Sequence, residues 1–164
     1  MPNFDDMFSQ SEQAIEYKGN VIIRFDDIPY KDGDSFLIEF ESTNSEWKQG
    51  ISLDVFGSFE IKGKTYPQQI VLWQDTSPKE FLFTLHEEKS LKKGPKRLPS
   101  KGLLGIKNVW DPGTGSIESW YNGAAMMVEE IKNGRRYRCN DGKPDDDFDD
   151  IVFTVTKVRN TYDK

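Results

Sequence analysis

Hydrophobic and polar residues alternate along most of the chain, which is the pattern of β-strands that bury one face. The clearest case is 35–41, where Phe36, Ile38 and Phe40 fall on one side of an extended segment. Further short strand-like runs cover 20–25, 53–61, 70–73, 80–85, 103–110 and 151–158. Turn-forming residues separate these runs roughly every 8 to 15 positions, so the pattern predicts about nine or ten short strands.

Residues 119–131 form the one segment whose pattern fits two structures. The part 124–130 contains residues that favour helices, but the neighbouring segments are strands, and we therefore expect a strand here too. Asn133 and Gly134 then predict a tight hairpin. The chain shows no alternation of strands and helices and no internal repeat. We therefore predict an all-β fold, an antiparallel β-sandwich with a jelly-roll-like arrangement.

The length of 164 residues favours one domain with a substantial core. We expect that single β-sandwich domain to cover residues 18–160. Residues 1–17 are expected to be a flexible tail or a short helix. Both interpretations stay open, because Phe4, Met7, Phe8 and Ile15 fit one helical face only loosely.

Charge and hydropathy narrow the classes of partner. The net charge of −6 argues against a general nucleic-acid binder, which needs a basic face. No apolar run approaches the roughly 20 residues that a membrane-spanning helix requires. Residues 1–20 lack the apolar stretch of a secretory signal, which indicates a cytoplasmic protein, or an exported one whose leader has been removed.

Few residues of this chain could carry out catalysis. Cys139 is the only cysteine and His86 the only histidine, which excludes an internal disulfide, a four-cysteine zinc site and most histidine-based sites. No nucleophile motif such as G-x-S-x-G is present. We therefore expect no enzymatic activity.

The highest charge density lies in residues 141–150, which hold six aspartates directly before an apolar strand. Like charges this close repel one another, and a hard cation with a preference for oxygen, usually Ca²⁺, relieves that repulsion. An EF-hand does not fit, because Asp150 stands where a glycine is needed and Thr156 where a glutamate is needed. The alternative is a calcium loop at the rim of a β-sandwich. Its candidate ligands are Asp141, Asp145, Asp147, Asp149 and Asp150.

Two other interpretations of these aspartates stay open. They can form a solvated acidic turn that binds nothing tightly. They can also be neutralised by arginines, because Arg135, Arg136 and Arg138 come just before them.

The run from Asp145 to Val155 resembles the signature D-x-D-[FY]-[ND]-D-[VIL]-[VIL]-F. That signature belongs to a bacterial C-terminal β-domain of unclassified function found in exported, surface-associated proteins. The resemblance implies a β-sandwich and calcium binding through Asp145, Asp147, Asp149 and Asp150. The chain departs from that family in lacking a visible signal peptide.

The run from Asn140 to Val155 is also similar to the calcium loop of small soluble bacterial galactose-binding lectins. That similarity implies Asp141, Asp145 and Asp149 as ligands and an ion that touches sugar hydroxyls. Phe148 departs from the lectin pattern, because it stands where the lectins carry an amide ligand. Either resemblance covers only a short part of the chain.

Aromatic residues suggest where a ligand would bind. Trp110, Trp120 and Tyr121 flank a turn that begins at Asp111, and exposed rings there could stack on sugars, although packing in the core is the ordinary role of tryptophan. The basic segment 89–101 could meet an anionic partner, or it could be a solvated loop.

These features favour a calcium-binding, non-catalytic module whose ligand is a carbohydrate. The alternative is a protein–protein interaction or assembly protein that uses acidic and basic loops without calcium.

Overall fold

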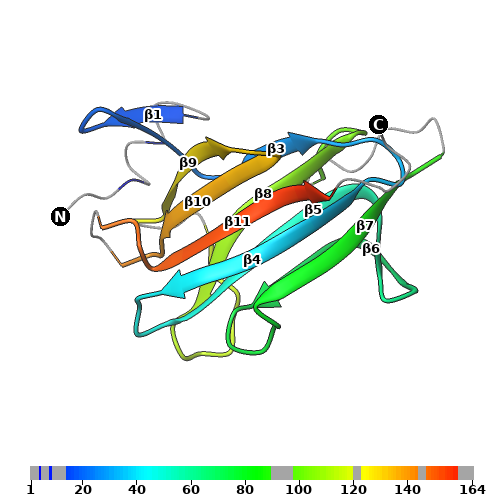
Figure 1. Ribbon diagram of the computed structural model, residues 1–164. Helices are drawn as coiled ribbons and strands as arrows, with labels where there is room; N and C mark the ends of the chain where they lie inside the picture. Colours follow the sequence, from blue (N-terminus) through cyan, green and yellow to red (C-terminus); the bar gives the residue numbers. More distant parts are fainter. Residues whose placement is uncertain are drawn as a thin grey trace.

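The computed structural model describes residues 4, 8, 14–89, 98–119, 123–143 and 147–158. Every named element in these ranges is a β-strand (Figure 1). The strands are β1 (Ala14–Tyr17), β2 (Asn20–Ile23), β3 (Asp26–Pro29), β4 (Ser35–Thr43), β5 (Lys48–Ile61), β6 (Lys64–Trp73), β7 (Glu80–Glu87), β8 (Leu103–Asp111), β9 (Ala125–Ile131), β10 (Gly134–Asn140) and β11 (Ile151–Val158). Within the described residues, no helix is long and apolar enough to cross a membrane.

All strands join one antiparallel sheet in the order β1-β2-β9-β10-β11-β4-β7-β5-β8-β3, with β6 also paired to β5. The long strand β5 pairs with β8 along its first part and with β7 along its last part. This change of neighbour lets the sheet curl into a half-barrel, with β8 and β5 behind β11 and β4 (Figure 1). The predicted all-β antiparallel fold is confirmed. The division into the two separate sheets of a sandwich is not confirmed, because hydrogen bonding runs continuously through β5.

The core lies inside this curl and is formed by alternate residues of the central strands, as the sequence pattern requires. The ring centroids of Phe36 and Phe83 lie 5.9 Å apart, and those of Tyr137 and Phe153 lie 5.0 Å apart. Aromatic pairs at these separations add to the stability gained by burying apolar area. The aromatic side chains therefore join strands that are distant in the sequence.

A polar clamp ties β3, at one end of the strand order, to β10 in the middle of it. The Asp26 carboxylate oxygen Oδ2 accepts a hydrogen bond from the Tyr137 hydroxyl at 2.6 Å and one from the Arg135 guanidinium at 2.7 Å. Burial and the Asp26 carboxylate raise the pKa of Tyr137 well above its usual range. The hydroxyl therefore stays protonated and keeps donating, so Asp26 joins β3 to β10.

The segment whose pattern fitted either a helix or a strand is a strand over most of its described length. Residues 125–131 are the strand β9, and the hairpin after them is confirmed, with Asn133 at φ 65°. A Cβ atom on Gly134 would collide with the carbonyl oxygen of Val155, so this position requires glycine.

The N-terminal segment contains more extended structure than the sequence suggested. Ala14–Tyr17 form the strand β1 paired with β2, where a flexible tail or short helix was expected. Phe4 and Phe8 have helical backbones and are buried. They pack in a small second core with Ile22, Ala125 and Phe148. Phe4 and Phe8 therefore pack beside Phe148 of the loop that carries the aspartates.

Candidate functional site

The acidic loop, residues 141–150, connects β10 to β11. The structure describes its two ends, 141–143 and 147–150, whereas the predicted ligand Asp145 lies outside the described residues. The loop meets the turn between β4 and β5, because the backbone N–H of Asn44 donates to the carbonyl oxygen of Asp150 at 3.1 Å. These two segments form what we call the rim.

Asp141 and Asp150 are buried, with exposed fractions of 1% and 4%. The Asp141 oxygen Oδ2 accepts hydrogen bonds from the Ser45 hydroxyl at 2.6 Å and from the Gln49 amide at 2.9 Å. Asp141 in turn donates its backbone N–H to Asp150 Oδ2 at 2.8 Å. Buried carboxylates need such donors, because an unpaired charge is costly away from water. These two aspartates therefore fasten the loop to the end of the half-barrel.

Asp149 and Asp147 lie closer to solvent. The Asn44 side-chain amide donates to Asp149 Oδ2 at 2.9 Å, which links the two segments of the rim a second time. The Asp147 backbone carbonyl accepts a long hydrogen bond of 3.4 Å from Arg138. The four described carboxylates of the loop thus divide into an inner pair, Asp141 and Asp150, and an outer pair, Asp147 and Asp149.

Phe148 separates the two outer aspartates and anchors the loop. It has a positive φ of 53°, which is unusual for a bulky residue. Its backbone N–H donates to the Asn140 side-chain oxygen at 2.8 Å, and its ring lies 5.7 Å from that of Phe4. The strained backbone buries the ring, and as a result Asp147 and Asp149 are left at the surface side of the loop.

An open hollow of about 420 Å³ adjoins the loop. Its walls carry hydroxyl, amide, carboxylate and ammonium groups, from Thr43, Asn44, Ser45, Glu46, Lys143 and Asp150. Nearby, the buried Gln49 side-chain oxygen has no hydrogen-bond partner among the described residues, although its amide nitrogen donates to Asp141. An orphaned acceptor beside a buried carboxylate suits a cation or an ordered water.

The arginines before the loop are largely engaged elsewhere. Arg135 pairs with Asp26 at 2.7 Å, and Arg136 pairs with Glu41 at 2.7 Å. Arg138 contacts the loop at the backbone carbonyl of Asp147. Arg135 and Arg136 thus have acidic partners outside the loop.

The predicted ligand-binding aromatics have different outcomes. Trp110 is only 1% exposed and packs against Gly142, which corrects the prediction that its ring forms an exposed sugar platform. A Cβ atom on Gly142 would lie 2.7 Å from the Trp110 ring. Trp120 and Tyr121 lie outside the described residues.

Asp111 closes the turn that follows β8. Its side-chain oxygen accepts hydrogen bonds from the backbone N–H groups of Gly113, Thr114 and Gly115. These bonds lower the pKa of Asp111, the one from Gly113 most of all. In this structure Asp111 stabilises its own turn.

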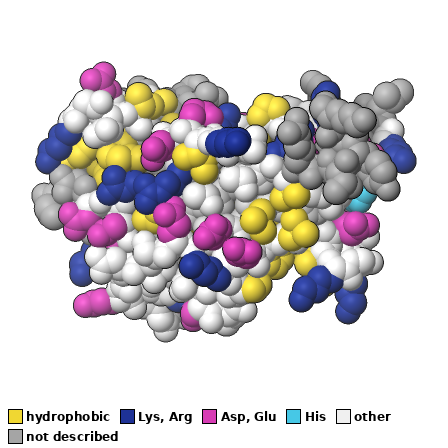
Figure 2. All heavy atoms as spheres, viewed as in Figure 1, with side chains coloured by type: hydrophobic (Ala, Val, Ile, Leu, Met, Phe, Trp, Pro, Cys, Tyr) yellow, Lys and Arg dark blue, Asp and Glu magenta, His cyan; other side chains and the backbone are white. Residues whose placement is uncertain are grey.

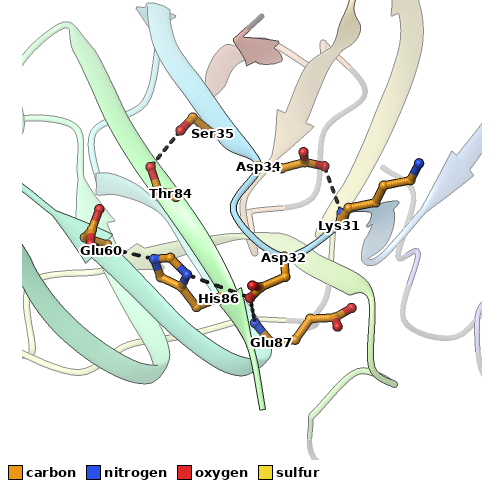
Figure 3. A network of polar contacts seen from close by, with 8 residues as sticks. All are labelled: Lys31, Asp32, Asp34, Ser35, Glu60, Thr84, His86 and Glu87. Carbon is orange, nitrogen blue, oxygen red and sulfur yellow. Dashed lines mark hydrogen bonds and ion pairs between the residues drawn. The ribbon is translucent and has the colours of Figure 1, made fainter. Parts of the chain in front are cut away.

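A second polar network lies where β4, β5 and β7 meet the turn before β4 (Figure 3). His86 lies between two carboxylates, with Nδ1 3.8 Å from Asp32 and Nε2 3.7 Å from Glu60. Both distances exceed those of hydrogen bonds. Asp32 instead accepts the backbone N–H of Glu87 at 2.8 Å, which indicates that this network shapes the turn.

Comparisons with known proteins identified no relative of this chain. No family model, no curated protein and no solved structure matches the chain. Within the described parts of the chain, no three acidic, histidine or cysteine side chains are grouped as a metal site.

Sequence reasoning missed three residues that bond to the aspartates of the loop: Asn44, Ser45 and Gln49. They lie about a hundred positions from the loop and have no local motif.

Proposed function

We propose that this protein is a non-catalytic binding module whose acidic loop holds one Ca²⁺ ion, with a carbohydrate as the ligand of the domain. One observation carries the calcium assignment: a hollow lined by hydroxyl, amide and carboxylate groups, together with Lys143, adjoins a loop that holds six aspartates in ten residues. The ion orders the outer part of the loop.

The oxygen atoms at the rim have the chemistry that calcium selects. Ca²⁺ takes about six to eight oxygen ligands from carboxylates, amide or backbone carbonyls and water. The bond from Asn44 to Asp149 uses one of about four acceptor positions of that carboxylate, which leaves capacity for an ion. The Gln49 oxygen, which has no hydrogen-bond partner within the described part of the chain, belongs to a side chain that contacts Asp141 and supports the same assignment.

The surface favours a neutral, hydroxyl-rich ligand over a polyanion. Figure 2 shows acidic and basic side chains of the described residues mixed on one face of the molecule. The net charge is −6, which disfavours binding to nucleic acid. Hydroxyl and amide groups, such as those of Thr43, Asn44 and Ser45 in the hollow, are suited to hydrogen bonding with sugars.

Isothermal titration with calcium tests the proposal. Wild type should bind one Ca²⁺, and Asp149→Ala should weaken binding at least tenfold, which corresponds to about 1.4 kcal/mol. Asp75→Ala is the matched control, because Asp75 is an exposed aspartate paired with Lys48. A glycan array probed with the calcium-loaded protein then tests the ligand class. Equal calcium affinity in the two variants, or no titration at all, would remove the calcium assignment.

The second candidate function is a protein–protein interaction without calcium. It is favoured by the finding that protein donors alone already satisfy Asp141, through Ser45, Gln49 and Lys143. Under this alternative the loop is held without an ion, and the protein would capture a partner equally well in chelator.

A further inference from the structure

The outer face of the paired strands β4 and β7, the side turned away from the core, carries an apolar pair and an acidic pair of side chains. These residues alternate with buried ones along both strands. Leu37 lies opposite Leu82, and Glu39 lies opposite Glu80. Residues two apart on a strand are separated by about 7 Å, so the two pairs adjoin each other. Figure 2 shows hydrophobic side chains gathered beside acidic ones on this face.

Glu39 and Glu80 face each other directly across the β4–β7 pair. Like charges in this position destabilise a sheet. Arg136 lies two strands away in the same row, but it pairs with Glu41 and Glu129. Within the part of the chain that the structure describes, no lysine or arginine pairs with either Glu39 or Glu80. A cation supplied from outside the chain would therefore relieve this repulsion.

The leucine pair exposes apolar surface beside these charges. Leu82 is 55% exposed although it lies within a strand of the sheet, and Leu37 opposite it is half-buried. Removing apolar surface from water is the main favourable term in most protein association. The face thus offers an apolar contact and a negative charge side by side.

The first half of β7 is also an edge of the sheet. β4 pairs with β7 from Glu80 to Thr84, whereas β5 pairs with it only from Thr84 to Glu87. Among the described strands, residues 80–83 therefore have a partner on one side only. Such an edge presents backbone N–H and C=O groups to which another extended chain can bond.

From these features we propose that the β7 edge, residues 80–83, binds an extended segment of a partner protein, which joins the sheet as an added strand. Backbone hydrogen bonds supply affinity in this mode, and alternate side chains supply specificity. The partner places an aliphatic side chain beside Leu82 and an arginine or lysine beside Glu80, two positions apart in its own sequence.

The acidic pair argues against two other occupants of this edge. Nucleic acid is disfavoured, because its phosphates carry the same sign of charge as the glutamates. A second copy of this chain that pairs through the same edge would bring two further glutamates to it. The surface is separate from the rim, and its binding does not depend on calcium.

Solution NMR with a panel of short synthetic peptides tests this site. The peptides are rich in threonine, and each carries arginine or lysine two positions from valine, isoleucine or leucine. Matched peptides that carry glutamate in place of the basic residue are the ligand controls. Binding should shift the methyl signals of Leu37 and Leu82. It should also slow amide hydrogen exchange at 80–83, which docking of side chains alone would not do.

Two variants measure the contributions of the apolar and the charged contact. Leu82→Ser should weaken peptide binding about four- to tenfold, because roughly half of this side chain remains to be buried. Glu80→Gln should weaken it about two- to fivefold, as expected for an exposed ion pair, and should reduce its dependence on salt. Glu80→Gln should also raise the melting temperature of the free protein, since it removes the repulsion with Glu39.

The β1–β2 hairpin offers matched control variants. Glu16 lies opposite Val21 there, and both are exposed. Glu16→Gln and Val21→Ser remove the same kinds of group at a different edge and should leave peptide binding unchanged. Thermal unfolding verifies that every variant is folded.

The outcomes separate the proposal from its alternatives. Peptide binding that slows exchange at 80–83, and weakens in Leu82→Ser and Glu80→Gln but in neither control variant, supports it. Methyl shifts without slower exchange would assign docking to the face and overturn strand addition. Binding that is equal in all folded variants, or no binding by any peptide, overturns the site. A wild-type dimer in sedimentation that dissociates in Leu82→Ser would assign the edge to a second copy and overturn the partner proposed.

Discussion

The clamp between Asp26, Arg135 and Tyr137 gives the sharpest stability prediction. Replacing Asp26 with alanine removes the acceptor of two hydrogen bonds, of 2.6 Å from Tyr137 and 2.7 Å from Arg135. The Tyr137 side chain is fully buried, and a buried donor left without a partner costs about 1–3 kcal/mol. Breaking a fully buried ion pair costs about 3–5 kcal/mol.

The ion pair is only partly buried, because the Arg135 side chain is 25% exposed and that of Asp26 18%. Solvent therefore screens part of the loss, and we expect Asp26→Ala to lower the free energy of unfolding by about 2–4 kcal/mol. Tyr137→Phe should cost less, about 0.5–1.5 kcal/mol, because it removes one hydrogen bond without leaving a buried group unpaired. The double variant should show a coupling energy, since both changes remove the same bond.

Urea unfolding with linear extrapolation measures these differences. Glu41→Ala is the matched control, because it breaks the more exposed pair with Arg136, where both side chains are about one-third exposed. A pair of that kind contributes about 0.2–1 kcal/mol. If Asp26→Ala lost no more stability than Glu41→Ala, the clamp would contribute no more than an exposed ion pair.

Three further predictions concern single positions. Burial, and to a smaller extent the Asp26 carboxylate, raise the pKa of Asp27 above its usual value of 3.8, while Arg135 lowers it. Ionised Asp27 therefore destabilises the folded state at neutral pH. Asp27→Asn should therefore raise the urea midpoint at pH 7, with a gain that shrinks as the pH falls through the raised pKa; a gain that grew on acidification would contradict this. Gly134→Ala should cost more than about 1–3 kcal/mol in the same assay, because its Cβ meets backbone that cannot move without opening the β10–β11 pairing. Phe148→Ala should cost about 3–5 kcal/mol, and a loss below about 1 kcal/mol would show that its ring does not anchor the acidic loop.

The strands were predictable because alternation along each of them reports directly on which face is buried. Phe36, Ile38 and Phe40 are all buried, as their spacing requires. The hairpin at Asn133 was predictable from two adjacent residues whose backbone preferences are strong. Local chemistry therefore identified these elements.

The curl of the sheet and the surroundings of the acidic loop were not predictable in the same way. Trp110 follows an ordinary strand pattern, and nothing in its sequence neighbourhood says that Gly142 packs on its ring. Ser45 meets Asp141 across 96 positions, a contact made by the fold and not by a motif. The sequence identified the charged loop, whereas only the structure shows which of its carboxylates are held by protein donors.

Thermal unfolding in calcium and in excess EDTA tests the central claim most directly. A ligand that binds only the folded state raises the free energy of unfolding by about 2.7 kcal/mol at a hundredfold excess over its dissociation constant. We predict a higher melting temperature in Ca²⁺ for wild type, and little or no calcium response in Asp147→Ala and Asp149→Ala. Identical melting temperatures of the wild type in calcium and in EDTA would contradict the account and favour the interaction function without calcium.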